Sequence, residues 1–380
     1  MQNFMAYLGA PNGSHPYGTR RAQLGQATPW TQIFSKIHVE YGNEIWGGAD
    51  NNDPYIGATF RGGVRAGEIA NNRINIMKLS PYYNAGKFDM VLGGQSRFPG
   101  RQQEFENNSR AHDSIGFAPY YGTLENYGDN GQRYNPLYAH SLELSQRGFM
   151  VENRNILANA GHGTQMALYE INLDFAKQFV PADICNDFLT SQGAGISLPL
   201  VMLAYMRDMG IRTQAAFQAS QYSNAFRRCG GQPQRLFGLL RDIEATDRKR
   251  PAFLAVELAN MAIGGNLLQT NVSGPGFTQQ AGNGITAPTQ TPFVHAFAFQ
   301  QGSGYSLVLF NVDINNSRNV QLNLPSAAGQ ATMYSLTGSS IGADNETGQA
   351  VNIQTSTLNN FSQSYNMSLQ PHSMVVITWP

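Results

Sequence analysis

The feature of this sequence that most restricts its fold is a change of pattern near residue 265. Before that point, short apolar segments alternate with segments of helical spacing; after it, no helical period appears. Strands that alternate with helices are typical of parallel βα units, whereas short strands between turn residues are typical of an antiparallel sandwich. We therefore predict an α/β domain over residues 1–265 and a β-sandwich over residues 266–380.

The same patterns predict the individual elements. Buried strands of the first domain are expected at residues 36–41, 88–92, 114–119, 166–170 and 213–218. Helices are expected between them, at residues 63–80, 137–160, 197–209 and 251–262. Strands of the second domain are expected at residues 293–300, 305–313, 319–325, 331–338 and 372–379.

The composition argues against several functional classes. Basic and acidic residues both number 25, so the net charge is zero, whereas a nucleic-acid-binding protein shows a basic excess. The sequence has no apolar stretch of about 18 residues, so we expect no membrane partner. It has no HExxH or CxxC motif and no phosphate-binding glycine loop, so we expect no metal and no cofactor. A chain rich in aromatic and uncharged polar residues favours neutral, hydrogen-bonding ligands such as sugars.

The two cysteines, Cys185 and Cys229, are too few for a disulfide scaffold or a four-thiolate zinc site. They can form one disulfide or stay separate thiols, and the sequence leaves both open. The first residues lack a basic segment followed by an apolar core, so they predict no signal peptide. Nothing in the sequence indicates the oligomeric state.

The strongest local motif is HVEYGNEIW, which ends at Trp46. The predicted strand ends before Gly42, which permits a tight exit, and the pair Asn43-Glu44 follows at its carboxyl end. In parallel barrels that rim gathers the catalytic side chains. We predict Glu44 as a proton donor, Asn43 as a partner for a sugar hydroxyl and Trp46 as a stacking surface for a sugar ring.

The second motif is MALYE, an apolar strand that ends at Glu170. Two glutamates at strand ends are what retaining glycoside hydrolysis requires, one as acid/base and one as nucleophile, with carboxyl groups about 5–5.5 Å apart. Glu44 and Glu170 are 126 residues apart, which suits three βα units of a barrel of about 250 residues.

The motifs EYGNEIW and ALYEINL, followed by a sandwich, resemble the clan A glycoside hydrolases, above all the arabinofuranosidase-like branch, glycoside hydrolase family 51 and its relatives. The resemblance implies a (β/α)8 barrel of the TIM type. It implies that Asn43-Glu44 ends strand 4 with Glu44 as the acid/base, and that Glu170 ends strand 7 as the nucleophile. It also implies a tyrosine after strand 6 beside the nucleophile; Tyr120 and Tyr121 are the candidates, and we favour Tyr120.

The sequence departs from the family at its start. Only 43 residues precede Glu44, whereas three βα units need about 100 or more. The family's strand-2 arginine also has no counterpart. We therefore expect an N-terminally truncated, incomplete barrel that holds strands 4–8, with exposed edges and uncertain activity. The full-length parent is expected to be secreted or periplasmic.

Further residues compete for or extend the site. Gln95, which follows the strand at 88–92, and His112 are candidates for substrate binding. Glu125, Glu143 and Glu152 are rival nucleophiles, but they fit less well because they lie in a loop or in helical segments.

Together these features predict a retaining glycoside hydrolase that acts on plant-type polysaccharides or oligosaccharides by double displacement, most closely an α-L-arabinofuranosidase. Two alternatives stay open. One is a β-xylosidase or β-glucanase of the same clan. The other is a non-catalytic carbohydrate-binding relic, because the barrel is expected to be truncated.

Overall fold

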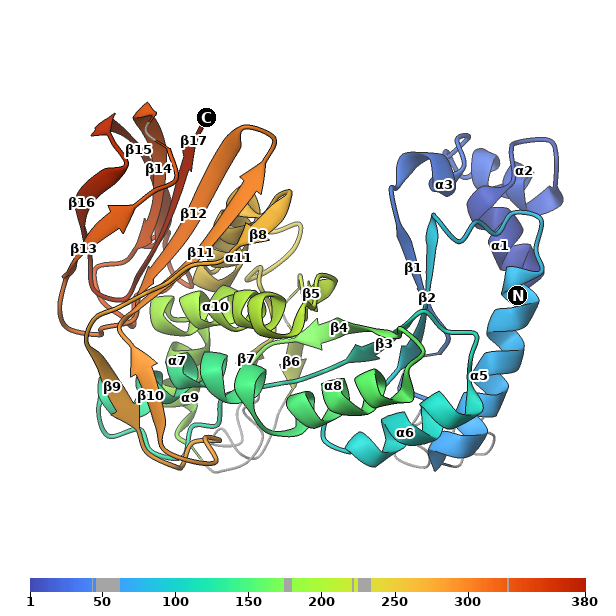
Figure 1. The fold of residues 1–380 in the computed structure, drawn as a ribbon, viewed down its shortest axis with the longest axis horizontal. Helices are drawn as coiled ribbons and strands as arrows, with labels where there is room; N and C mark the ends of the chain where they lie inside the picture. The colour runs from blue at the N-terminus through green and yellow to red at the C-terminus, as the bar shows by residue number, and fades with distance from the viewer. Residues whose placement is uncertain (43, 46–61, 174–179, 221, 225–233, 327) are drawn as a thin grey trace. The chain divides into compact units, whose positions relative to one another are not determined.

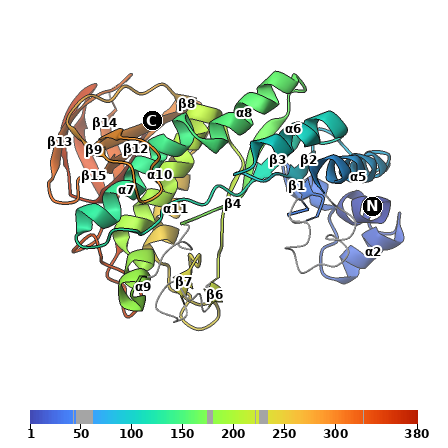
Figure 2. The same cartoon turned by 90° about the horizontal axis from the view of Figure 1, so that it is seen from below.

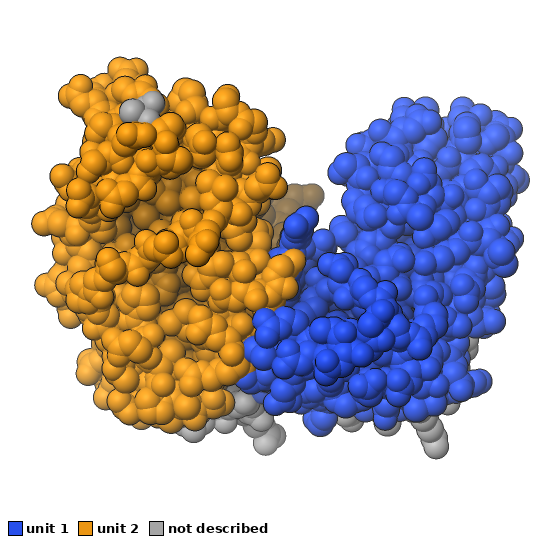
Figure 3. All heavy atoms as spheres, viewed as in Figure 1, with its two compact units in different colours: residues 1–119, 148–169, 211–213 blue, residues 120–147, 170–210, 214–380 orange. Residues whose placement is uncertain are grey.

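The computed structural model describes every residue except 43, 46–61, 174–179, 221, 225–233 and 327. Asn43, Trp46 and Cys229 therefore lie outside the described residues. The chain divides into two compact units (Figure 3). Unit 1 holds residues 1–119, 148–169 and 211–213, and unit 2 holds residues 120–147, 170–210 and 214–380.

Unit 1 combines helices with most of a parallel sheet (Figure 1). Its helices are α1 (Gln2–Gly9), α2 (Pro16–Gln23), α3 (Trp30–Ile33), α5 (Gly62–Lys78), α6 (Pro99–Asn108) and α8 (Phe149–Ala160). Its strands are β1 (Ile37–Glu40), β2 (Phe88–Gly93), β3 (Ser114–Phe117) and the first residues of β4 (Gln165–Ile171). Helix α6 packs against both α5 and α8.

The N-terminal helices are tied together by a buried arginine. Arg21, on α2, has 0% of its surface exposed. Its guanidinium donates hydrogen bonds to the carbonyl oxygens of Tyr7 at 2.6 Å and Ala10 at 2.7 Å. A buried charge must have its donors satisfied, so these carbonyls fix where the end of α1 lies against α2.

The sheet has the strand order β1-β2-β3-β4-β5, with β5 at Gln214–Ala216. The pairs β1–β2, β2–β3 and β3–β4 are parallel. One face is apolar and buried, and it includes Met90, Leu92 and Ile115 with 0% exposure. These strands confirm the predicted parallel α/β arrangement, and each overlaps its predicted segment. Their assignment to barrel strands 4–8 stays a prediction.

The helical part of unit 2 consists of α7 (Asn130–Gln146), α9 (Ala182–Thr190), α10 (Gln192–Met209) and α11 (Pro251–Ala262), with the short hairpin β6 (Tyr222–Asn224) and β7 (Gln234–Leu236). Helix α10 packs on both α7 and α11 (Figures 1 and 2). The single helical segment predicted at 137–160 is wrong, because it contains the end of α7 and all of α8. Gly148 separates them with φ of 77°, a left-handed conformation that glycine tolerates.

After α11 every described element is a strand, as the sequence predicts for this region. The strands are β8 (Asn266–Leu268), β9 (Gly276–Gln279), β10 (Thr289–Pro292), β11 (Val294–Gln301), β12 (Gly304–Asn311), β13 (Arg318–Asn323), β14 (Gly329–Thr337), β15 (Asn352–Phe361), β16 (Ser364–Leu369) and β17 (Ser373–Trp379). An antiparallel sheet has the order β15-β14-β17-β12-β11-β8, and β13 pairs with β16 separately. The two sheets share a buried core that includes Leu309, Leu322 and Leu369.

The opposite face of the six-stranded sheet packs on α11. Val308, Phe310 and Val376 on that sheet have 0% exposure. Among the described residues, no single helix has both the length and the apolar composition to cross a membrane, although α9 and α10, joined at a bend of 53°, meet those criteria as a pair.

A buried ion pair holds the loop between β14 and β15 against the start of α11. Arg250 Nε donates to Glu346 Oε1 at 2.6 Å, and the two side chains are 3% and 6% exposed. A second donor of the guanidinium, Nη1, binds the carbonyl oxygen of Gly238 at 2.8 Å. Removal of one partner from such a pair leaves the other charge buried and uncompensated.

We therefore expect Glu346→Ala to lower the free energy of unfolding of unit 2 by about 3–5 kcal/mol. The measurement is urea denaturation followed by circular dichroism. Glu68→Ala is the matched control, because Glu68 pairs with Arg65 on an exposed face and should cost less than about 1 kcal/mol. Equal losses for the two variants would contradict this account of the buried pair.

Unit 2 is also expected to lose stability in mild acid. Burial lowers the pKa of His140 and His295 to about 4, whereas an unfolded histidine titrates near 6.5. The unfolded chain thus binds more protons between those values, so the stability present above about pH 6.5 is lost as the pH falls toward 4. Within that pH range, each histidine should lower the free energy of unfolding by on the order of 1 kcal/mol for each unit by which the pH falls. The urea concentration at which half of the protein is unfolded, measured at pH 7 and at pH 5, tests this. His295→Gln should reduce the difference between the two values.

Candidate active site

Glu44 follows β1 through a tight turn that only particular residues permit. Gly42 has φ of 75°, and a Cβ there would collide with Cγ2 of Ile45, whose side chain is buried at 1% exposure. Glu44 itself has φ of 49°, a left-handed conformation that is uncommon for any residue with a side chain. Glu44 is half-buried and lies just after the carboxyl end of β1.

The carboxylate of Glu44 has a tyrosine partner from β4. Tyr169 Oη donates to Glu44 Oε1 at 3.3 Å. The ring of Tyr169 lies over Gly116 of β3, where a Cβ would come within 3.2 Å of Tyr169 Cδ1. The sequence motifs alone do not single out Tyr169, although it directly precedes Glu170 in MALYE. A glycine on β3 therefore makes room for a polar side chain from the next strand.

A second glycine does the same for Glu40, the last residue of β1. A Cβ on Gly93 would lie 2.6 Å from Glu40 Oε1 and 3.9 Å from the backbone nitrogen of Glu44. The carboxylate of Glu40 therefore occupies the space above Gly93, next to the turn that carries Glu44. Gly93 and Gly116 are register partners in the sheet, so the two positions without a side chain lie side by side.

Glu170 is also held by a tyrosine. Tyr120 Oη donates to Glu170 Oε2 at 2.6 Å. The ring of Tyr120 packs against Phe237 at a centroid distance of 5.2 Å and meets Phe217 edge-on at 6.4 Å. These contacts fix the direction of the hydroxyl. Tyr121, the other candidate, turns into the interior instead: it is 1% exposed, and its hydroxyl lies 3.0 Å from Ser197 Oγ.

Parallel pairing of β3 with β4 ends at Phe117 and Leu168, and an isolated parallel bridge follows between Tyr121 and Leu173.

The other predicted binding residues lie in different places. Gln95 is half-buried after the carboxyl end of β2, and its backbone is paired with the side chain of Gln102. His112 precedes β3, at the opposite edge of the sheet from Glu44, so the structure does not bring these two together. Its ring lies 3.0 Å from Ser109 Oγ and 3.2 Å from Glu106 Oε1, and its side chain is 1% exposed.

His112 therefore belongs to a buried structural cluster around Glu106. Glu106 has 0% exposure, and Nδ1 of His162 lies 2.5 Å from its other oxygen. Burial alone would raise the pKa of the Glu106 carboxyl, but hydrogen bonds from His112, Thr164 and His162 lower it below its ordinary value. The cluster holds α6 to the segments before β3 and β4.

Each rival carboxylate has a structural partner or an exposed position. Glu125 Oε2 accepts a hydrogen bond from the backbone of Asn283 at 2.9 Å. Glu143, on α7, is 3% exposed and pairs with Arg147 at 2.8 Å. Glu152 is exposed in the first turn of α8, where a negative charge favours the helix dipole.

In the described part of the chain, no group of three or more histidine, cysteine or acidic side chains is arranged to hold a metal ion. Cys185 on α9 is disulfide-bonded.

Comparisons with solved structures identify the fold. The α-L-arabinofuranosidase from Thermotoga maritima, in its arabinose complex, superimposes with a TM-score of 0.72 at 17% identity, over 99% of this chain and 72% of that one. The thermostable family 51 α-L-arabinofuranosidase from Thermotoga petrophila RKU-1 gives 0.73 at 17% identity, over 100% and 72%. The family 51 enzyme from Xanthomonas axonopodis pv. citri gives 0.70 at 15% identity, also over 100% and 72%.

No protein-family profile and no curated protein sequence matches the chain. At identities of 15–17%, the structural likeness establishes the fold and not the activity. The resemblance predicted from the two motifs is thus confirmed at the level of architecture.

The scaffold of the site predicts a sharp difference between two glycine substitutions. A Cβ on Gly94, just after β2, would lie 2.6 Å from Cγ2 of Ile115 and 3.2 Å from the carbonyl oxygen of Gly116. Gly94→Ala should therefore lower the free energy of unfolding of unit 1 by about 1–3 kcal/mol through overpacking. Urea denaturation measures the change.

Gly100 in α6 is the control, because a Cβ there meets nothing within 4 Å. Gly100→Ala should be neutral or stabilise the protein by at most about 1 kcal/mol, since alanine loses less backbone entropy on folding. A Gly94→Ala variant as stable as Gly100→Ala would show that the edge of the sheet is less tightly packed than described.

Proposed function

We propose that this protein is a retaining glycoside hydrolase in which Glu44 is the acid/base and Glu170 is the nucleophile. The observation that carries the proposal is that each carboxylate stands at or beside the carboxyl end of a parallel strand with a tyrosine hydroxyl bonded to one oxygen. The two motifs also meet at β4, where Tyr169, the partner of Glu44, immediately precedes Glu170. The family 51 fold supports the assignment.

The proposed reaction has two displacements. Glu170 attacks the anomeric carbon while Glu44 donates its proton to the departing glycosidic oxygen, so the old bond breaks as the glycosyl-enzyme bond forms. Glu44 then removes a proton from water, and the water oxygen displaces Glu170 from the anomeric carbon. The carboxylate of Glu170 is regenerated, and the configuration of the sugar is retained.

The tyrosines have positioning roles in this scheme. A hydrogen bond from Tyr120 holds Oε2 of Glu170 and so restrains the orientation of the carboxylate that attacks the sugar. Tyr169 restrains one oxygen of Glu44 in the same way. Preorganised side chains lower the barrier because the enzyme spends no energy on reorienting them during the reaction.

We propose an α-L-arabinofuranoside as the substrate, because the two Thermotoga structures described above are α-L-arabinofuranosidases and one of them is an arabinose complex. We further propose that β1 to β5 correspond to strands 4–8 of an eight-stranded barrel. A β-xylosidase or β-glucanase of the same clan is the second candidate, and a scaffold that binds carbohydrate without turnover is the third. Asn43 and Trp46 keep their proposed roles as sugar contacts, as does Gln95.

The disulfide at Cys185 supports a site of action outside the cytoplasm. Disulfides persist in oxidising compartments and are rare in the cytosol. We therefore propose a secreted or periplasmic protein.

Kinetics with aryl glycosides test the two carboxylates separately. Glu170→Gln should reduce hydrolysis of 4-nitrophenyl α-L-arabinofuranoside to the background rate, because an amide cannot form the glycosyl-enzyme. Glu44→Gln should slow hydrolysis of substrates with poor leaving groups by about 10²–10⁴-fold. It should slow formation of the glycosyl-enzyme much less when the leaving group is an acidic dinitrophenol, which needs no protonation.

Glu152→Gln is the matched control, since Glu152 is exposed on α8 and should leave the rates unchanged. Wild-type activity that survives Glu170→Gln would remove the nucleophile assignment. Turnover of β-xylosides in preference to arabinofuranosides would favour the second candidate, and binding of sugar without any turnover would favour the third.

A further inference from the structure

The C-terminal strands have an unusual surface chemistry. Residues 266–380 contain only four charged residues, which are Asp313, Arg318, Asp344 and Glu346. Asp313 and Arg318 form an ion pair with each other, and Glu346 pairs with Arg250. The exposed polarity of these strands therefore comes almost entirely from amides and hydroxyls.

The outer face of the β13–β16 sheet arranges such groups in opposed pairs, and β15 of the larger sheet also exposes amides and hydroxyls. The register places Asn319 opposite Ser368, Gln321 opposite Asn366, and Asn323 opposite Ser364, and all six side chains are exposed. The alternating residues between them, such as Leu322, pack on the core of the sandwich. Because side chains alternate along a strand, one face becomes a regular array of uncharged polar groups, with rows about 7 Å apart.

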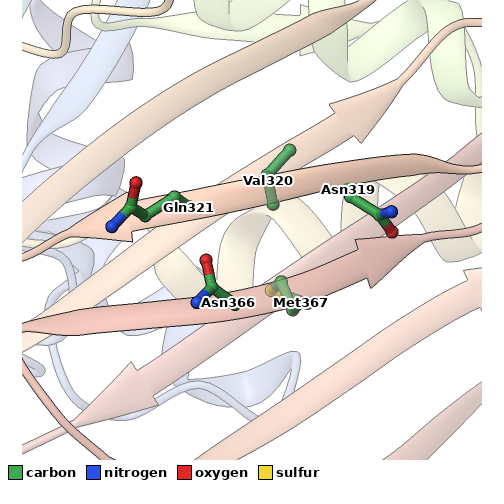
Figure 4. Close-up of a pocket in the computed structure, with 5 residues that line it drawn as sticks. All are labelled: Asn319, Val320, Gln321, Asn366 and Met367. Carbon is green, nitrogen blue, oxygen red and sulfur yellow. The ribbon is translucent and has the colours of Figure 1, made fainter.

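A groove of about 450 Å³ lies on this sheet. Figure 4 shows Asn319, Val320 and Gln321 along β13 and Asn366 and Met367 along β16, the five residues that line it. It is a shallow depression, largely open to solvent. Each amide supplies two donors and one acceptor oxygen, whereas Val320 and Met367 stand at the alternate positions and pack against the core of the sandwich.

We propose that this groove, which we call the amide groove, binds a neutral polysaccharide. Sugar hydroxyls both donate and accept hydrogen bonds, as amides and serine hydroxyls do, so the two surfaces complement each other without any charge. A face without cations has no electrostatic attraction for nucleic acid or for acidic polysaccharides. It also lacks the aromatic and arginine side chains that dominate protein interfaces.

The amide groove belongs to unit 2 and contains neither proposed catalytic glutamate, so this proposal does not depend on the reaction. A second polysaccharide site would raise the local concentration of polymer substrate through multivalent attachment. Its effect should therefore be seen with polymers and not with small aryl glycosides.

The test is affinity electrophoresis of the full chain in gels with and without neutral arabinoxylan, with Glu170→Gln in the background to prevent turnover. The double variant Gln321→Ala/Asn366→Ala should bind about tenfold more weakly, the effect of losing two hydrogen-bonding side chains. The control is Thr355→Ala/Thr357→Ala, two exposed residues of β15 in the same sandwich, which should leave binding unchanged. A gel with polygalacturonate should not retard any of the proteins.

Three results would overturn the proposal: unchanged retardation of the double variant, equal retardation by polygalacturonate, and self-association in sedimentation that the double variant abolishes. The last result would make the face an interface between copies of this chain. Hydrolysis of the small aryl arabinofuranoside, measured with Glu170 restored, should be the same with and without the double substitution. If the chain binds arabinoxylan through the groove but hydrolyses no substrate, the proposed reaction is wrong and the proposed binding site is still supported.

Discussion

Parallel pairing of β1, β2, β3 and β4 is the constraint on which the candidate site depends. Parallel strands end at one edge, so residues far apart in sequence are delivered to the same side of the sheet. Glu44 and Tyr169 are separated by 125 residues and still meet through a hydrogen bond. The glycines at 93 and 116 complete the arrangement, because bulkier residues there would displace Glu40 or Tyr169.

The two proposed catalytic carboxylates are supported by different physical means. The Glu44 carboxylate depends on a turn in which Gly42 and Glu44 both have positive φ. The Glu170 carboxylate depends on a hydroxyl whose direction is set by the aromatic contacts of Tyr120 with Phe217 and Phe237. Backbone conformation thus orients one of these acidic groups, and aromatic packing orients the other.

The sandwich shows how a chain with few charges keeps a polar exterior. Its inner residues, such as Leu309 and Leu369, supply the core, and its outer positions carry amides and hydroxyls instead of lysine or glutamate. The few charges that it has are mostly used in ion pairs, one of which joins the sandwich to the start of α11. One face of each strand therefore contributes to the stability of the sandwich, and the other face determines its surface chemistry.

The sequence by itself determined the parallel α/β sheet, the change to antiparallel strands after residue 265 and the strand-end positions of Glu44 and Glu170. These follow from periodicity and local turn chemistry, which are properties of neighbouring residues. Only the tertiary structure showed that Tyr169 contacts Glu44, and that His112 supports a buried glutamate at the other edge. It also placed Tyr120, the tyrosine favoured from the family resemblance, on Glu170. These outcomes depend on contacts between distant segments, which leave no periodic signal in the sequence.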